Sequence, residues 1–188
     1  MKAILGFLCL YLAACGLPAL AAGGIVQTGV KQSHFSAKPV ALRLRSGAVL
    51  VLAQDSGEPM FAKNVDQIMP IASITKLMTA MVVLDSGLPL LESIDIDKSD
   101  VDHKKGSRSK LQIGTTLMRA EMLKLALMAS ENRAAAALAR NFPGGTEAFV
   151  AAMNQKAAEL GMVNSHFEDP TGLTPDNVST AEDLAKMV

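Results

Sequence analysis

The stretch Pro70-Ile71-Ala72-Ser73-Ile74-Thr75-Lys76, with the helix that it opens, decides the predicted fold. Apolar residues recur from this stretch onward at the spacing of one buried helical face, namely at Ile74, Leu77, Met78, Met81 and Val82. Gly87 and Pro89 supply a stop signal just after Asp85. The pattern therefore predicts a helix that runs to Asp85 and buries that face.

Ser73 and Lys76 are three residues apart, which makes them neighbours on the first turn of the predicted helix. The partial positive charge of a helix N-terminus disfavours a second cation and favours the neutral, proton-accepting amine. A serine before a helix is also an ordinary N-cap, and about one Ser-x-x-Lys arises by chance in a chain of this length. A second such stretch, Ser107–Lys110, lies in a basic run without helical periodicity, and we interpret it as a solvated loop.

The N-terminal segment, residues 1–22, is predicted to be an export signal. Lys2 forms a short positive region, an apolar stretch follows, and Ala19-Leu20-Ala21 fits a small-residue cleavage pattern. The segment is too short to favour a transmembrane helix. Leu12-Ala13-Ala14-Cys15 resembles a bacterial lipobox, so lipidation at Cys15 is an alternative and the only predicted route to membrane association. Both alternatives predict an exported, periplasmic chain.

The composition excludes several classes of function. Both cysteines lie in the predicted signal, so a chain cleaved after Ala21 keeps 167 of 188 residues and has neither a disulfide nor a thiolate metal site. That chain carries 17 basic and 18 acidic side chains, which gives no argument for nucleic-acid binding. The three histidines are scattered without zinc-helix spacing. We therefore expect no metal and no cofactor.

The rest of the chain combines strand and helix patterns. After an irregular lead-in (residues 23–45), residues 46–54 and 60–62 are predicted to form a hairpin around Asp55–Pro59, and 91–102 includes an edge strand. Helices are predicted at 117–129, 134–140 and 146–160, and Ser179-Thr180-Ala181-Glu182 is a capping box for one more. Without an alternating strand–helix rhythm, this favours an antiparallel sheet with helices against it, an α+β fold. Residues 46–188 would form this domain.

A second chemical motif, Ser130-Glu131-Asn132, lies between two predicted helices. Serine and asparagine are also ordinary cap residues, and a Ser-x-Asn occurs by chance in about every second chain of this size. The order and separation of the two motifs are more informative. A Ser-x-x-Lys that opens a buried helix, followed some fifty residues later by Ser-x-Asn on a helix–helix loop, is typical of penicillin-recognising serine acyl enzymes.

The chain resembles peptidase family S11, the D-alanyl-D-alanine peptidases among the low-molecular-mass penicillin-binding proteins. Long runs carry the resemblance, and they are Pro70–Asp85, Leu125–Ala136, Pro143-Gly144-Gly145, Leu160-Gly161-Met162 and Pro170-Thr171-Gly172-Leu173. It extends over residues 47–188 and implies the penicillin-binding-protein/β-lactamase-like transpeptidase fold. The family's later Lys-Thr-Gly motif and the remaining, C-terminal strands of the sheet are missing from this sequence. For that reason we expect little or no turnover from the 188-residue chain itself.

The resemblance implies a role for each motif residue. Ser73 would be the nucleophile that forms an acyl-enzyme, and Lys76 would be the base that takes its proton. Ser130 would relay a proton to the leaving amine, and Asn132 would hold the substrate peptide. Glu131 is expected to be a solvated or structural side chain.

The resemblance also implies peptidoglycan peptides as substrates and β-lactams as covalent inhibitors. It does not decide between cleavage of cross-bridges (endopeptidase) and trimming of terminal D-alanine (carboxypeptidase). Two alternatives remain open. One is a class A β-lactamase-like hydrolase, which would need a glutamate to position water, with Glu168 as the nearby candidate. The other is a non-catalytic chain that binds wall peptides.

Overall fold

The computed structural model describes residues 43–103 and 105–188. The predictions of an export signal, of lipidation at Cys15 and of most of the irregular lead-in concern residues 1–42, which lie outside this range. Among the described residues, no helix is both long enough and apolar enough to cross a membrane.

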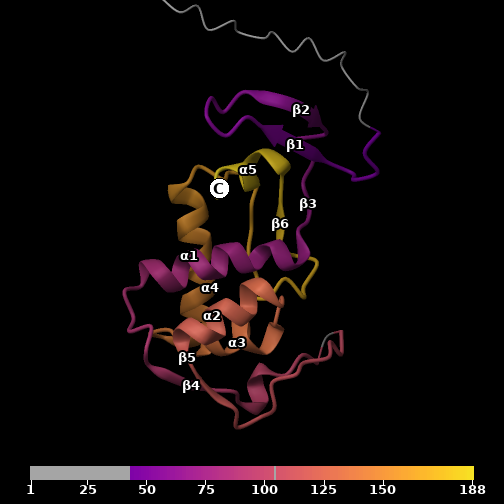
Figure 1. Cartoon of the computed structure of the whole chain (residues 1–188). Helices are drawn as coiled ribbons and strands as arrows, with labels where there is room; N and C mark the ends of the chain where they lie inside the picture. The colour runs from indigo at the N-terminus through magenta and orange to yellow at the C-terminus, as the bar shows by residue number, and fades with distance from the viewer. Residues whose placement is uncertain (1–42, 104) are drawn as a thin grey trace, which may run out of the picture. The chain divides into compact units, whose positions relative to one another are not determined.

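Strands and helices alternate irregularly along the described chain (Figure 1). The strands are β1 (Val49–Leu52), β2 (Pro59–Lys63), β3 (Met69–Pro70), β4 (Ser93–Asp95), β5 (Thr116–Met118) and β6 (Val178–Ser179). The α-helices are α1 (Thr75–Asp85), α2 (Arg119–Met128), α3 (Asn132–Arg140), α4 (Gly145–Glu159) and α5 (Ala181–Ala185). Two short 3-10 helices are η1 (Ala72–Ile74) and η2 (Lys98–Asp100).

All strand pairs in the described residues are antiparallel, as the sequence predicts. The predicted hairpin is formed by β1 and β2, with Val49 opposite Lys63 and Val51 opposite Phe61. β4 pairs with β5, which confirms a strand within 91–102. The pair β3–β6 is two residues long in each strand and was not predicted. It joins the segment just before Ser73 to a segment over one hundred residues later.

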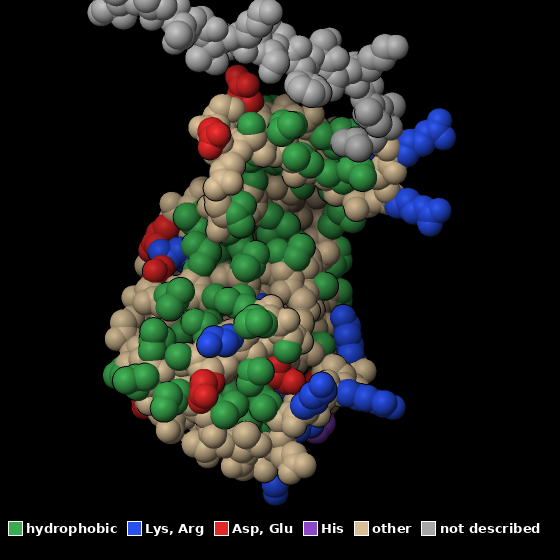
Figure 2. Space-filling model, in the orientation of Figure 1, with side chains coloured by type: hydrophobic (Ala, Val, Ile, Leu, Met, Phe, Trp, Pro, Cys, Tyr) green, Lys and Arg blue, Asp and Glu red, His purple; other side chains and the backbone are tan. Residues whose placement is uncertain are grey.

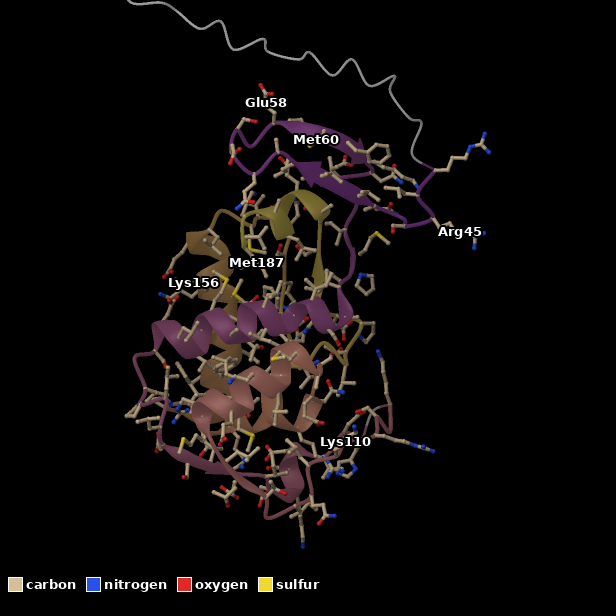
Figure 3. All side chains as sticks on the ribbon, in the orientation of Figure 1. Arg45, Glu58, Met60, Lys110, Lys156 and Met187 are labelled. Carbon is tan, nitrogen blue, oxygen red and sulfur yellow. The ribbon has the colours of Figure 1, made fainter. Side chains whose placement is uncertain are left out.

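The helices around α1 form the core. α1 packs against α2, α3 and α4, and Figure 1 shows it between the β1–β2 hairpin and the α2–α3 pair. The largest apolar side chains with at most 1 % exposure are Met78, Ile94, Ile96, Met122, Leu138, Phe149, Met153 and Phe167. At the C-terminal end of α1, Asp85 pairs with Lys156 of α4 at 2.7 Å. Figure 3 shows the Lys156 side chain on α4. Burial of these apolar side chains supplies the main driving force for assembly.

The predicted buried face of α1 is only partly correct. Met78 and Val82 are buried, but Ile74 and Leu77 are 45 % and 39 % exposed. The helix instead buries polar residues, namely Thr75, Lys76 and Thr79, because the segment that follows residue 168 covers that side. Ile74 and Leu77 line an apolar groove of about 860 Å³ that is bounded by β1 and α5. Figure 2 shows hydrophobic side chains gathered between the hairpin and α1.

The predicted C-terminal helix is present, but its cap is shifted by one residue. Thr180, not Ser179, is the N-cap, and its hydroxyl accepts a hydrogen bond from the Asp183 N–H at 3.0 Å. Ser179 belongs to β6, where its hydroxyl lies 2.7 Å from that of Ser165. The strand pairing therefore occupies Ser179 and leaves the capping position to its neighbour.

Candidate active site

Ser73 lies in the 3-10 turn η1, immediately before α1. Ala72 has a left-handed backbone (φ +47°), a conformation that a residue with a side chain adopts rarely. Ser73 is exposed, and its hydroxyl caps neither η1 nor α1. The N-cap interpretation of this serine is therefore wrong, and the sharp turn presents its side chain to solvent.

Lys76 is buried, with only 2 % exposure, and has three polar neighbours. Its Nζ atom lies 2.7 Å from Asn132 Oδ1, 2.7 Å from the backbone oxygen of Thr171 and 3.3 Å from Ser73 Oγ. The first two atoms can only accept hydrogen bonds, and a neutral amine has two hydrogens and one lone pair. When the amine is neutral, the two carbonyl oxygens take both hydrogens and the lone pair is left for the Ser73 hydroxyl.

Burial lowers the pKa of Lys76 below its ordinary value, because the low-dielectric surroundings penalise the ammonium form. The negative charges of Asp169 and Glu131 act in the opposite direction and offset part of this effect. Glu131 is half-buried and caps α3 by accepting a hydrogen bond from the Arg133 N–H. It is thus a structural side chain, as expected, that also acts electrostatically on Lys76.

Asn132, the first residue of α3, joins the Lys76 site to a more distant loop. Its Oδ1 accepts from Lys76, while its Nδ2 donates to the hydroxyl of Ser107 at 2.9 Å. Ser107 lies in a loop, as predicted, and Arg108 and Lys110 of that loop are exposed, but Ser107 itself is half-buried and is bound by Asn132. The Ser107 N–H is held by Asp102 Oδ2 at 2.8 Å.

Ser130 lies in the turn between α2 and α3 and has a left-handed backbone (φ +52°). Its side chain is exposed, and its hydroxyl makes no hydrogen bond within the described part of the chain. The structure therefore joins Ser73, Lys76 and Asn132 by direct contacts, and it holds Ser130 two residues from Asn132 in a strained turn. The proton-relay role of Ser130 stays a prediction.

The turn of residues 169–174 completes the site, and sequence reasoning gave it no role. Its Thr171 carbonyl contacts Lys76, and its Pro170 carbonyl accepts from Thr79 at 2.7 Å. One feature of the sequence indicates such a segment, because Thr75, Lys76 and Thr79 share one face of a helix that packs into a core. Buried polar groups need hydrogen-bond partners, so another segment must supply them. A cleft of about 250 Å³ lies beside the turn and is lined by Asn132, Thr171 and residues 99–103.

Within residues 43–103 and 105–188, no three histidine, cysteine, aspartate or glutamate side chains gather closely enough to hold a metal ion. The candidate β-lactamase glutamate, Glu168, is exposed and pairs with His166 at 2.7 Å. The arrangement at Lys76 suits nucleophilic attack by Ser73 with an adjacent amine as base.

Comparisons with known proteins agree with this chemistry. Residues 33–188 match the model of the Peptidase S11 family, described as D-alanyl-D-alanine carboxypeptidase. A D-alanyl-D-alanine endopeptidase of Pseudomonas aeruginosa is 53 % identical over 150 residues, which are 80 % of this chain and 48 % of that protein. The enzyme of the same name from Escherichia coli is 48 % identical over 77 % of this chain and 47 % of its own length. The chain thus spans about half the length of these curated relatives.

Solved structures of similar proteins have the same fold. A Streptomyces DD-transpeptidase superposes with a TM-score of 0.72 at 29 % identity, over 78 % of this chain and 60 % of that one. A penicillin-binding protein from Listeria monocytogenes, solved in its ampicillin-bound form, has a TM-score of 0.65 at 32 % identity over 78 % and 61 %. The expected penicillin-binding-protein fold is confirmed. The chain belongs to the Peptidase S11 family of D-alanyl-D-alanine carboxypeptidases.

Proposed function

We propose that the protein is a serine-type D-alanyl-D-alanine peptidase that works through an acyl-serine intermediate. The observation that carries this proposal is the environment of Lys76, whose Nζ has two carbonyl acceptors at 2.7 Å and the Ser73 hydroxyl at 3.3 Å. This arrangement supports a neutral amine whose lone pair faces the hydroxyl. Membership in the Peptidase S11 family supports the reaction class.

In the proposed acylation, Ser73 Oγ attacks the carbonyl carbon of the penultimate D-alanine while its proton passes to Lys76 Nζ. The carbonyl oxygen becomes an oxyanion, to which the Ser73 N–H donates one hydrogen bond, a contact typically worth about 3 kcal/mol. The bond to the leaving amine then breaks, and that nitrogen takes the proton of the Ser130 hydroxyl, which is replaced by the proton that Lys76 took from Ser73. The products of this half-reaction are an ester on Ser73 and a free amine.

In deacylation, water attacks the ester carbonyl and gives a proton to Lys76 Nζ, which passes it to the released Ser73 oxygen, so that the acyl group leaves as the free acid. Asn132 would hold the peptide of the acyl group, since its side chain borders the cleft beside the 169–174 turn. Its amide is already oriented by Lys76 on one side and Ser107 on the other. A fixed amide of this kind lowers the entropy lost when the substrate is positioned.

The proposed substrates are peptidoglycan peptides, and the proposed covalent inhibitors are β-lactams, which would acylate Ser73. Relatives at 53 % and 48 % identity are named endopeptidases, whereas those named carboxypeptidases are 35 % identical or less. This difference supports cleavage of cross-bridges over trimming of terminal D-alanine. The proposed location is the periplasm, with a membrane anchor only if Cys15 carries a lipid.

A fluorescent penicillin tests the proposal, applied to the complete protein and to the 188-residue chain in parallel. On the complete protein we expect a stable covalent label that its Ser73→Ala variant loses. Ser86→Ala is a matched control, because Ser86 ends α1 at the opposite end from Ser73 and its hydroxyl binds only neighbouring backbone. Rapid loss of the label would instead indicate a β-lactamase-like hydrolase, and an unlabelled complete protein would indicate a non-catalytic peptide-binding chain.

A further inference from the structure

The 169–174 turn is built around the carboxylate of Asp169. Asp169 Oδ1 accepts hydrogen bonds from the Thr171 N–H, the Thr171 hydroxyl and the Gly172 N–H at 2.6, 2.8 and 2.7 Å. Asp169 Oδ2 accepts from the Thr174 N–H at 2.8 Å. One side chain therefore satisfies three backbone donors of a mostly buried segment and determines its conformation.

The same turn lies directly against the nucleophile and its base. Thr171 presents its carbonyl oxygen to Lys76 Nζ. Gly172 lies so close to Ala72 that an added Cβ atom would be 1.9 Å from the Ala72 oxygen and 3.0 Å from the Ser73 nitrogen. The turn therefore supports the strained backbone before Ser73 and one of the two carbonyl acceptors of Lys76.

Asn177 anchors the other end of this segment. Its Nδ2 donates to Thr75 Oγ1 at 3.0 Å and to the Asp169 carbonyl at 2.8 Å, and its Oδ1 accepts the N–H groups of residues 168 and 169. Because Thr75 is the first residue of α1, the segment is tied to the helix start from both ends. Movement of the turn would therefore be transmitted to Ser73 and Lys76.

We propose that Asp169 is a positioning residue for the Ser73–Lys76 pair. Its carboxylate holds the turn in the conformation in which the Thr171 carbonyl accepts from Lys76 and Gly172 supports the backbone of Ala72 and Ser73. When that acceptor is in place, the lone pair of the neutral amine points at the Ser73 hydroxyl. This inference rests on the proposed function, because it assigns Asp169 an effect on acylation.

The charge of Asp169 provides a second, separable effect. Burial would raise the pKa of Asp169, but the hydrogen bonds from Thr174, Thr171 and Gly172 hold it below its usual range, so the group is anionic at neutral pH. The charged groups that act on Lys76 are this carboxylate and Glu131, and both raise the Lys76 pKa against the effect of burial. Loss of the Asp169 charge therefore lowers the Lys76 pKa.

Asp169→Asn in the complete protein tests the proposal. An amide can accept with its oxygen but not with its nitrogen, so the donors of the turn lose an acceptor and the turn shifts. Because a displacement of about 1 Å can cost about 100-fold in rate, we expect acylation by a fluorescent penicillin to fall roughly 10- to 100-fold per folded molecule. We also expect the midpoint of the pH profile of acylation to move to lower pH, because the loss of the Asp169 charge lowers the Lys76 pKa.

Asp183→Asn is the matched control. Like Asp169, Asp183 is an aspartate that accepts several hydrogen bonds, from the Asn164 N–H, the Ser165 hydroxyl and Lys186, but it is buried and belongs to α5. Its loss should reduce stability while the acylation rate per folded molecule and the pH midpoint stay at the wild-type values. Equal effects of the two variants on the rate, or a wild-type rate in Asp169→Asn, would overturn the proposal.

Two further measurements cover the remaining outcomes. If Asp169→Asn does not fold, Thr171→Val removes the hydrogen bond from the Thr171 hydroxyl to Asp169, and the one this hydroxyl accepts from the Leu173 N–H, but keeps the Asp169 charge. A smaller fall in rate with an unmoved midpoint is then expected. An unchanged rate would then refute the proposal. If the wild-type protein is not labelled, the proposed function fails, and the Lys76 pKa is followed by NMR instead. A lower value in Asp169→Asn than in the wild type supports the effect of the Asp169 charge. A chemical shift of the Ser73 N–H that changes in Asp169→Asn but not in Asp183→Asn supports positioning, and an unchanged shift contradicts it.

Discussion

Lys76 links the chemistry of the site to its packing, because the burial that lowers its pKa also brings it among fixed acceptors. A lysine with its ordinary pKa would be almost fully protonated at neutral pH and could not accept the Ser73 proton. Desolvation raises the fraction of neutral amine without removing the group from the hydroxyl. The residue is thus prepared for proton transfer by its surroundings before substrate binds.

The pH dependence of acylation tests this view of Lys76. Because the neutral amine is the base, the acylation rate should rise with pH and level off above the folded-state pKa of Lys76, which lies below 10.5. The measurement is the rate of labelling by a fluorescent penicillin across the pH range in which the protein stays folded. A rate that falls over this rise in pH would contradict the assignment of Lys76 as base.

Gly172 is the residue at which a single methyl group should be least tolerated. It has φ +82°, and an alanine Cβ would lie 1.9 Å from the Ala72 carbonyl oxygen. We expect Gly172→Ala to cost about 3 kcal/mol or more in the free energy of unfolding, measured by urea denaturation. Gly161→Ala is the control, since Gly161 has φ +69° but open space around it, and about 1 kcal/mol is expected there.

At the scale of elements, polar pairs determine how the helices meet the small sheets. Arg140, the last residue of α3, reaches η2 and β4: its guanidinium contacts the buried Asp100 carboxylate at 3.0 and 3.1 Å and the Asp95 carbonyl at 2.6 Å. The hydrogen bonds that Arg140 donates to the Asp100 carboxylate raise the pKa of Arg140, so its charge is retained. This contact fixes the β4–η2 segment, whose continuation leads to Ser107.

Asp100→Asn should weaken the α3–η2 contact. The Asp100 side chain is 2 % exposed but that of Arg140 is 28 % exposed. We therefore expect the free energy of unfolding to fall by about 2 kcal/mol, which lies between the values for exposed and for fully buried ion pairs. The urea midpoint measures this loss. Asp85→Asn, which removes a pair whose carboxylate is 53 % exposed, should lower the midpoint much less, and a larger effect there than at Asp100 would contradict this account.

At the scale of the whole molecule, segments distant in sequence converge on the first turn of α1. The residues that contact Lys76 come from η1, from the start of α3 and from the 169–174 turn, 3, 56 and 95 positions away. The contacts across 56 and 95 positions form only when the chain is assembled, because each closes a large loop. The site is therefore expected to be lost together with the fold.

Acid should destabilise the folded molecule through two carboxylates that accept several hydrogen bonds. Hydrogen bonds hold the pKa values of Asp169 and Asp183 below their usual range although burial opposes this effect. In the unfolded chain these groups titrate at about 3.9, so the unfolded state binds more protons at acid pH. The stabilisation is present above about pH 4 and is lost as pH falls through the folded-state values.

Thermal unfolding between pH 7 and pH 2 measures this effect. We expect the melting temperature to decline below about pH 4, and to decline less steeply in Asp183→Asn because one of the responsible groups is removed. A melting temperature that rises as the pH is lowered through this range would contradict the linkage.

The sequence alone determined the helix before Asp85, the β1–β2 hairpin, the antiparallel pairing and the family. Local periodicity, turn chemistry and long motif runs encode these features, and each of them acts within a few residues. The predicted burial of Ile74 and Leu77 was wrong, because distant segments cover the other side of α1. The predicted cap at Ser179 was also wrong, because a distant strand pairs with Ser179.

Only the tertiary structure brought the 169–174 turn and Ser107 to the motif residues. Neither has a local pattern that points to Lys76 or Asn132, because their partners lie 95 and 25 positions away in the chain. After the core has packed, long-range hydrogen bonds form between the buried polar groups that still lack a partner. Sequence thus specified the chemical groups, and packing decided which of them meet.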